Sequence, residues 1–218
     1  SLQAFEFFSD PALEKVIEAH GYPKPFETYA PFYALIDFDN QDNTSQDDAL
    51  KLYSECADKK LVLDGVMSES IAQSQNMWKL REDISETLWH YQPYKNDLSV
   101  RISKMPKFLD EVGSFIKKSY PNFEVIWYGH IGDGNLHLNI LKPAALNKSE
   151  FKSLCDDISM NLGQLVESYD GSISAEHGVG ILKRDYLKFS KSSGEISLMA
   201  EVKKVFDPKG ILNPGKLL

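Results

Sequence analysis

The segment WYGHIGDGNLHLNI, residues 127–140, constrains the fold more than any other part of the chain. Its residues alternate as in a strand on both sides of Asp133-Gly134. This dipeptide is typical of two-residue hairpin loops, because a type I′ turn needs positive φ at both central positions. Strands joined this tightly cannot be parallel, so the segment predicts an antiparallel hairpin.

The two histidines of this hairpin form a candidate metal site. Pairing around the turn places His130 opposite His137, with Cβ atoms about 4.5–5.5 Å apart on one face. Two imidazoles at that separation can share a divalent metal. Tyr128 and Asn139 project from the same face, because strand side chains alternate. The alternative is a solvent-facing side of a hairpin, where polar residues are common.

The segment GSISAEHGVGILKRDY, residues 171–186, supplies a third candidate ligand. A catalytic metal site uses three protein ligands and keeps a position open, and Glu176 fits the third place. The glycines that follow break the strand and let the side chains of Glu176 and His177 turn toward one site. In that site His177 is predicted to be a general base. The alternative is a plain strand-to-helix turn. Nucleotide binding is disfavoured, since neither GxGxxG nor a GK[ST] ending is present.

Short apolar runs alternate with helical patterns along the chain. Strands are predicted at 33–38, 61–67, 98–103, 124–131, 136–142 and 171–175. Helices are predicted near 10–19, 46–59, 69–91, 104–119, 148–169, 180–189 and 194–206. With the antiparallel hairpin, this order predicts an α+β fold in which helices cover a largely antiparallel sheet.

Composition excludes several classes of protein. Hydrophobic residues make up 42% of the chain and charged residues 26%, which is too apolar a balance for disorder. A net charge of −8 argues against a nucleic-acid partner. Cys56 and Cys155 have no CxxC spacing, so we expect neither a disulfide framework nor a cysteine zinc site. No apolar run approaches the roughly 20 residues that a transmembrane helix needs.

Three segments together resemble one protein family: GHIGDGNLH at 129–137, AEHGVG at 175–180 and FDPKGILNPGKLL at 206–218. The chain resembles the C-terminal catalytic domain of the FAD-linked oxidases of D-2-hydroxy acids, which are flavoproteins of the vanillyl-alcohol oxidase type. YKND at 94–97 is similar to a segment of the same family. The resemblance implies one domain over 1–218 with a duplicated ferredoxin-like α+β fold. It also implies an N-terminal FAD-binding domain that this chain lacks.

Carried over by position, the resemblance implies roles for individual residues. The implied ligands of a divalent metal, expected to be Zn²⁺, are His130, His137 and Glu176, and the implied general base is His177. The implied substrate-binding residues are Arg81, Ser85, Lys95 and Asn139. The implied cofactor-binding residues of the NPGK tail are Asn213 and Lys216.

Arg81 is also a candidate from its own surroundings. Met77, Arg81, Ile84 and Leu88 make one helical stripe, and a guanidinium within an apolar stripe needs a partner. Arginine binds carboxylates bidentately. The alternative is a snorkelling side chain paired with a nearby glutamate.

The implied function is oxidation of a D-2-hydroxy acid to its 2-oxo acid. D-2-hydroxyglutarate is favoured over D-lactate or glycolate, because Arg81 and Lys95 together could bind a dicarboxylate. The expected partners are the FAD-binding domain and a flavoprotein or quinone as electron acceptor, and a homodimer is allowed. The expected location is the bacterial cytoplasm or, in a eukaryote, the mitochondrion. A metal-dependent hydrolase using the same two histidines and glutamate, and a non-catalytic binding module, stay open as alternatives.

Overall fold

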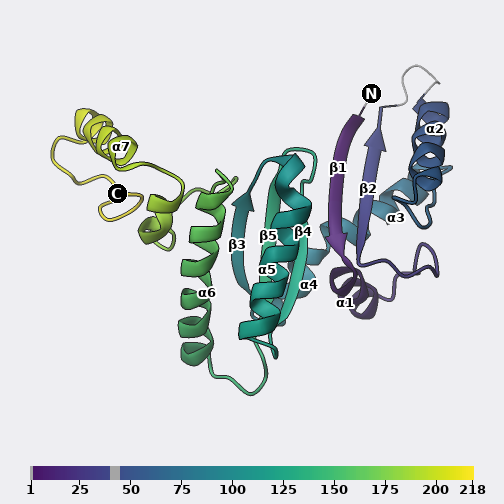
Figure 1. Ribbon diagram of the computed structural model, residues 1–218, viewed down its shortest axis with the longest axis horizontal. Helices are drawn as coiled ribbons and strands as arrows, with labels where there is room; N and C mark the ends of the chain where they lie inside the picture. Colours follow the sequence, from purple (N-terminus) through teal and green to yellow (C-terminus); the bar gives the residue numbers. More distant parts are fainter. Residues whose placement is uncertain (1, 40–44) are drawn as a thin grey trace. The chain divides into compact units, whose positions relative to one another are not determined.

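A computed structural model of the chain describes residues 2–39 and 45–218. The chain divides into two compact units. The first comprises Ser1–Pro93 and Val125–Gly132, and the second comprises Tyr94–Glu124 and Asp133–Leu218. The elements of each unit are labelled in Figure 1.

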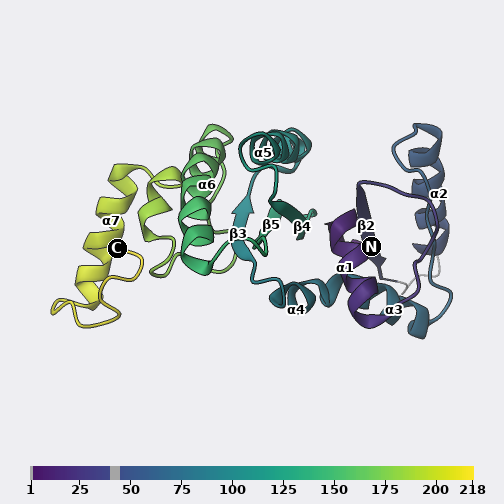
Figure 2. The same ribbon diagram turned by 90° about the horizontal axis from the view of Figure 1, so that it is seen from below.

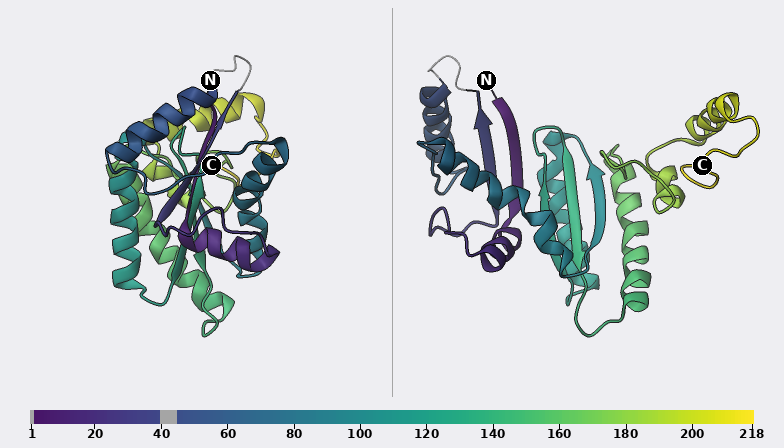
Figure 3. Two further views of the ribbon diagram at one scale, coloured as in Figure 1. Left: turned by 90° about the vertical axis from the view of Figure 1, so that its right-hand side faces the viewer. Right: turned by 180° about the vertical axis from the view of Figure 1, so that it is seen from behind.

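Three antiparallel strands lie in the first unit. Strand β1 (Leu2–Ser9) pairs with β2 (Phe32–Phe38), and also with β4 (Glu124–Gly129) through Phe7 and Gly129. The pairing of β1 with β2 can be followed in Figure 3. The sequence predicted β2 and β4 but not β1, whose apolar run is interrupted by Glu6. Glu6 is nevertheless buried.

Four helices lie in the described part of the first unit. Helix α1 (Asp10–His20) has proline in its first turn, buries Ala12, Leu13 and Val16, and ends at Gly21 with φ +69°. The other three are α2 (Ser45–Asp58), α3 (Ile71–Glu82) and α4 (Ile84–Trp89).

The sequence predicted one helix over 69–91, but the structure interrupts it at Asp83. The side chain of Asp83 accepts a hydrogen bond from Tyr22 Oη at 2.8 Å. The strand predicted at 61–67 is wrong. That segment forms no strand, and its apolar side chains Leu61, Leu63 and Val66 are exposed.

The second unit is built around one antiparallel strand pair. Strand β3 (Tyr94–Ser99) pairs with β5 (Asn135–Leu141), every residue of which is buried. The strand predicted at 98–103 therefore begins earlier, and a 3₁₀ turn, η1 (Ile102–Lys104), follows it. Helices α5 (Met105–Ser119) and α6 (Lys148–Ser168) belong to the same unit (Figure 2).

Helix α5 could be predicted from the spacing of its apolar residues. Its buried residues, Met105, Phe108, Val112 and Ile116, recur at helical spacing. Helix α6 starts at a capping box in which Asn147 and Glu150 satisfy each other's backbone N–H groups.

The C-terminal part of the second unit is less regular than predicted. The strand expected at 171–175 is reduced to one bridge between Ser99 and Ser172. The helix expected at 180–189 is a 3₁₀ helix, η2 (Arg184–Phe189). Helix α7 (Ser193–Phe206) confirms the last prediction and starts at a capping box of Ser192 with Glu195.

The fold is α+β, as predicted, and every strand pair described above is antiparallel. Cys56 and Cys155 are both unbridged. Within the described ranges, no helix combines the length and apolarity that crossing a bilayer requires.

Candidate metal and substrate site

The register of β3 with β5 puts an aspartate opposite one of the predicted metal ligands. Asp97 pairs with His137, and Lys95 pairs with Asn139. Directly opposed residues of an antiparallel pair project from the same face. One face of this strand pair therefore carries two predicted substrate-binding residues, a predicted metal ligand and Asp97, which the sequence did not single out.

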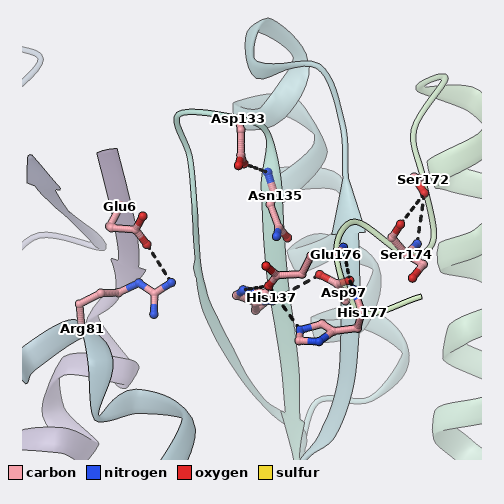
Figure 4. Close-up of polar contacts among 10 residues, drawn as sticks. All are labelled: Glu6, Arg81, Asp97, Asp133, Asn135, His137, Ser172, Ser174, Glu176 and His177. Carbon is pink, nitrogen blue, oxygen red and sulfur yellow. Dashed lines mark hydrogen bonds and ion pairs between the residues drawn. The ribbon is translucent and has the colours of Figure 1, made fainter. Parts of the chain in front are cut away.

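His137 lies between two carboxylates (Figure 4). Its Nδ1 is 3.5 Å from Asp97 Oδ1, and its Nε2 is 3.1 Å from Glu176 Oε1. His137 is buried, whereas the side chain of Glu176 is 43% exposed. The histidine side of the cluster is therefore buried, and the glutamate side is accessible to solvent.

Asp97 also holds the segment that carries Glu176 and His177. Its Oδ2 accepts hydrogen bonds from the backbone N–H of Glu176 at 2.9 Å and of His177 at 3.1 Å. Burial of Asp97 favours a higher pKa, but the neighbouring His137 side chain and the hydrogen bonds from these two backbone groups outweigh it and lower the pKa to about 2. Asp97 is thus an anion that fixes this segment against β3.

Asp97, His137, Glu176 and His177 form a group able to hold a metal ion, with one ligand atom from each lying within 4.8 Å of the others. Glu176 Oε1 is 3.1 Å from His137 Nε2 and 3.3 Å from His177 Nε2. In a tetrahedral site with bonds of about 2.0 Å, neighbouring ligand atoms are about 3.3 Å apart. Nitrogen and carboxylate donors at this spacing fit a divalent metal such as Zn²⁺.

A second polar cluster, in the first unit, contains two further predicted site residues. Buried Glu6 faces Arg81, with 2.8 Å between Oε2 and Nη2, and faces His130, with 2.7 Å between Oε1 and Nδ1. The first contact is an ion pair without hydrogen-bond geometry. The Arg81 guanidinium also lies 4.8 Å from the centre of the Tyr128 ring. The partner that the apolar stripe required is Glu6.

The turn between β4 and β5 differs from the prediction. Residues 130–134 connect the two strands, and only Gly134 among them has positive φ, at +89°. A type I′ turn at Asp133-Gly134 is therefore wrong, because Asp133 lacks positive φ. Instead, Asp133 Oδ1 accepts a hydrogen bond from Asn135 N at 3.1 Å. The facing of His130 and His137 across this turn stays a prediction.

The remaining predicted residues differ in burial. Asn139 is 1% exposed, and its Oδ1 has no hydrogen-bond partner among the described residues. Ser85 on α4 and Lys95 on β3 are exposed. The tail residues Asn213 and Lys216 are also exposed, and Lys216 Nζ donates to Asn213 Oδ1 at 3.2 Å.

Sequence reasoning missed Glu6 and Asp97. Asp97 alternates with Lys95 in YKND, and that spacing could have found it if the strand had been started at residue 94 rather than 98. Glu6 carries a weaker signal, a single carboxylate within an apolar run. The predicted strands gave it no partner.

Known proteins resemble this chain over its whole length. Residues 1–217 match the family described as FAD linked oxidases, C-terminal domain. A D-2-hydroxyglutarate dehydrogenase of Stutzerimonas stutzeri is 55% identical over 99% of this chain and 47% of its own length. A mitochondrial D-2-hydroxyglutarate dehydrogenase of Arabidopsis thaliana is 36% identical over 100% of this chain and 38% of its own.

A mitochondrial protein of Schizosaccharomyces pombe that is named as a D-lactate dehydrogenase is 33% identical, over 99% of this chain and 42% of its own length. The chain thus spans less than half the length of each of these relatives.

Proposed function

Since this chain belongs to the family of FAD linked oxidases, C-terminal domain, we propose that it is the substrate- and metal-binding domain of a flavin-dependent dehydrogenase. The substrate is a D-2-hydroxy acid, D-2-hydroxyglutarate in this proposal, and the product is the 2-oxo acid. The observation that carries the proposal is the cluster of His137, Glu176 and His177 around Asp97, in a chain similar throughout to dehydrogenases of that name. FAD is bound mainly by an N-terminal domain of the same protein.

The proposed metal ligands are His130, His137 and Glu176. The spacing of Glu176 Oε1 from His137 Nε2 supports this assignment. When bound, Zn²⁺ supplies Lewis acidity at the C2 hydroxyl, and FAD supplies the acceptor for the C2 hydride. The chain's own residues orient the substrate and accept the proton of its C2 hydroxyl.

His177 is the proposed general base. Its side chain is 67% exposed, so a substrate can reach it, and its Nε2 lies beside Glu176. A neutral imidazole within hydrogen-bond reach can accept the proton of the C2 hydroxyl. The backbone bond from His177 N to Asp97 supports this role, because it restricts the position of the base.

The proposed substrate contacts are Arg81, Ser85, Lys95 and Asn139. Lys95 and Asn139 are cross-strand neighbours on the face that carries His137, which supports carboxylate binding beside the metal cluster. Arg81 is buried against Glu6 in the structure, whereas Lys95 is exposed on β3, and its exposure supports Lys95 as the contact of the distal carboxylate. In the tail, Asn213 and Lys216 are proposed to contact FAD. A flavoprotein or quinone is the proposed electron acceptor, in the bacterial cytoplasm or the mitochondrion.

Metal analysis tests the proposed ligands. We expect one divalent metal per chain in protein purified without a histidine tag, and loss of that metal in the double variant His130→Ala, His137→Ala. His90→Ala is the matched control, because His90 is exposed and lies outside both clusters. Stoichiometric metal in the double variant would contradict the ligand assignment.

Turnover by the full-length protein tests the substrate. A charge-assisted hydrogen bond contributes about 1.5–3 kcal/mol, so Lys95→Ala is expected to lower kcat/KM for D-2-hydroxyglutarate about ten- to a hundredfold more than for D-lactate. Lys107→Ala removes an exposed lysine of α5 and serves as the charge control. Equal losses on both substrates would reject the dicarboxylate assignment, and faster turnover of D-lactate or glycolate by the unaltered protein would replace it.

A further inference from the structure

Both histidines predicted to bind metal have a carboxylate at the same ring nitrogen. Glu6 Oε1 lies 2.7 Å from Nδ1 of His130, and Asp97 Oδ1 lies 3.5 Å from Nδ1 of His137. The two contacts belong to different units of the chain and involve different elements. Sequence patterns indicated neither carboxylate.

Glu6 is held in a fixed place by more than its histidine. It is 6% exposed, and the ion pair with Arg81 at 2.8 Å offsets the cost of burying its charge. The stacking of Arg81 over Tyr128 restricts the guanidinium in turn. The Oε1 atom that faces His130 is therefore placed by β1, α3 and β4 together.

Asp97 is held by two backbone donors. Because the N–H groups of Glu176 and His177 occupy its Oδ2, the other oxygen is left facing His137. That oxygen is buried and accepts no hydrogen bond from the residues that the structure describes, and its 3.5 Å distance from Nδ1 is longer than an ordinary N–H···O bond. A buried acceptor without a partner is costly, and a proton on His137 Nδ1 would satisfy it after a shift of a few tenths of an ångström.

We propose that Glu6 and Asp97 are positioning residues that each accept the Nδ1 proton of their histidine, so that His130 and His137 present Nε2 to a divalent metal. A neutral imidazole carries one proton, and an acceptor beside Nδ1 keeps it there. Nε2 is then the unprotonated nitrogen that can ligate. This inference rests on the proposed metal site, which it deepens.

The geometry indicates that Asp97 orients the ligand His137 and is not itself a metal ligand. Glu176 faces Nε2 of His137, and Asp97 faces Nδ1 on the opposite edge of the ring. An ion bound between Glu176 and Nε2 lies on the far side of the imidazole from Asp97. Asp97 is thus the carboxylate that accepts the second ring N–H of the ligand, an arrangement common around metal-binding histidines.

Two amide substitutions test the proposal, Glu6→Gln and Asp97→Asn. In each variant a single carbonyl oxygen replaces two carboxylate oxygens, and positive or N–H groups already attract it to the side away from the histidine. These groups are the Arg81 guanidinium at position 6 and the two backbone N–H groups at position 97. The NH₂ group is left facing Nδ1. It donates there, which moves the ring proton to Nε2, the atom required for the metal.

The first measurement is Zn²⁺ affinity of the 218-residue chain by competition with a chelator. Each variant is expected to bind about 10- to 100-fold more weakly than the unaltered chain. Asp207→Asn is the matched control, because Asp207 is buried and its carboxylate also accepts two backbone N–H groups, from Ile211 and Leu212, while its ion-pair partner is Lys203 rather than a histidine. Its affinity for Zn²⁺ is expected to stay unchanged.

The second measurement is the histidine tautomer, from ¹⁵N chemical shifts of the metal-free neutral rings and from the nitrogen that couples to bound ¹¹³Cd²⁺. We expect Nδ1–H rings and coupling to Nε2 in the unaltered chain, and Nε2–H at the affected histidine in each variant. A merely structural role would leave the tautomer unchanged.

The outcomes separate the two proposals. Failure of the unaltered chain to bind Zn²⁺ would overturn the proposed metal site. Binding by the unaltered chain together with full affinity in both variants would overturn only the positioning role. Weaker binding with an unchanged tautomer would also overturn it. If a variant does not fold, the unaltered chain still decides, since Nε2–H rings or coupling to Nδ1 would contradict the inference.

Discussion

Removing Arg81 is expected to destabilise the first unit far more than removing an ordinary surface cation. The side chains of Arg81 and Glu6 are only 9% and 7% exposed, so neither charge is solvated. Arg81→Ala leaves the carboxylate of Glu6 buried without its cation. Breaking a buried pair in this way costs about 3–5 kcal/mol, compared with about 0–1 kcal/mol for an exposed pair.

Tryptophan fluorescence during urea unfolding measures this loss of stability in the first unit, which contains Arg81 and Glu6. The chain has three tryptophans, at positions 78, 89 and 127, and all of them belong to the first unit. With a denaturant slope of about 2–3 kcal/mol per molar urea, Arg81→Ala should lower the unfolding midpoint by about 1–2.5 M. Lys79→Ala, on the exposed side of α3, is the control and should cost less than about 0.5 kcal/mol.

A double-mutant cycle decides whether the cost arises from the orphaned charge. The Glu6→Gln background lacks the buried carboxylate that Arg81 neutralises, so Arg81→Ala should cost at least 1 kcal/mol less there than in the unaltered chain. A loss below about 1 kcal/mol for the single variant would refute the reasoning. An equal loss in both backgrounds would refute it too, because packing of the arginine stem would then account for the effect.

Two further predictions concern the second unit. Burial lowers the pKa of Lys183 from 10.5 to about 8 against the attraction of two aspartates, so between those values the unfolded chain binds more protons. Stability relative to Lys183→Met should therefore rise as pH increases from about 8 to 10.5, and parallel pH profiles in urea unfolding would contradict this. Gly163→Ala should destabilise the chain, because a Cβ there would lie 2.2 Å from the Phe189 ring, whereas Gly113→Ala, with nothing within 4 Å, should stabilise it by about 0.5–1 kcal/mol. Thermal unfolding of both alanine variants checks the contrast, and equal shifts would show that helix propensity alone decides.

The helices could be predicted because their signals are local. The apolar stripe of α5 and the capping residues before α6 and α7 lie within a few positions of the helices they define. The strands depend on partners that are distant in sequence. Strand β1 pairs with β2 and β4, and the pattern around Glu6 carries no sign of either.

The candidate site could be predicted in part for the same reason. His130, His137, Glu176 and His177 lie in short motifs, and the structure brings three of these four together in the second unit. Asp97 reaches His137 only through the β3–β5 register, and Glu6 reaches His130 only because β1 pairs with β4. The partner of a supporting residue on another strand is not given by the local sequence, whereas the ligands themselves lie in motifs of recognisable spacing.

The Glu6 cluster changes how a loss of activity at Arg81 should be interpreted. Arg81 neutralises Glu6, and Glu6 contacts His130, so Arg81→Ala alters the predicted metal ligand as well as any substrate carboxylate. Reduced turnover in that variant therefore cannot by itself assign Arg81 to the substrate. Lys95 lies on a different strand, β3, in the second unit. If Arg81 acts mainly through Glu6, Arg81→Ala weakens Zn²⁺ binding and lowers the turnover of every hydroxy acid by a similar factor. Lys95→Ala, in contrast, keeps the metal and lowers turnover more for substrates with two carboxylates than for substrates with one.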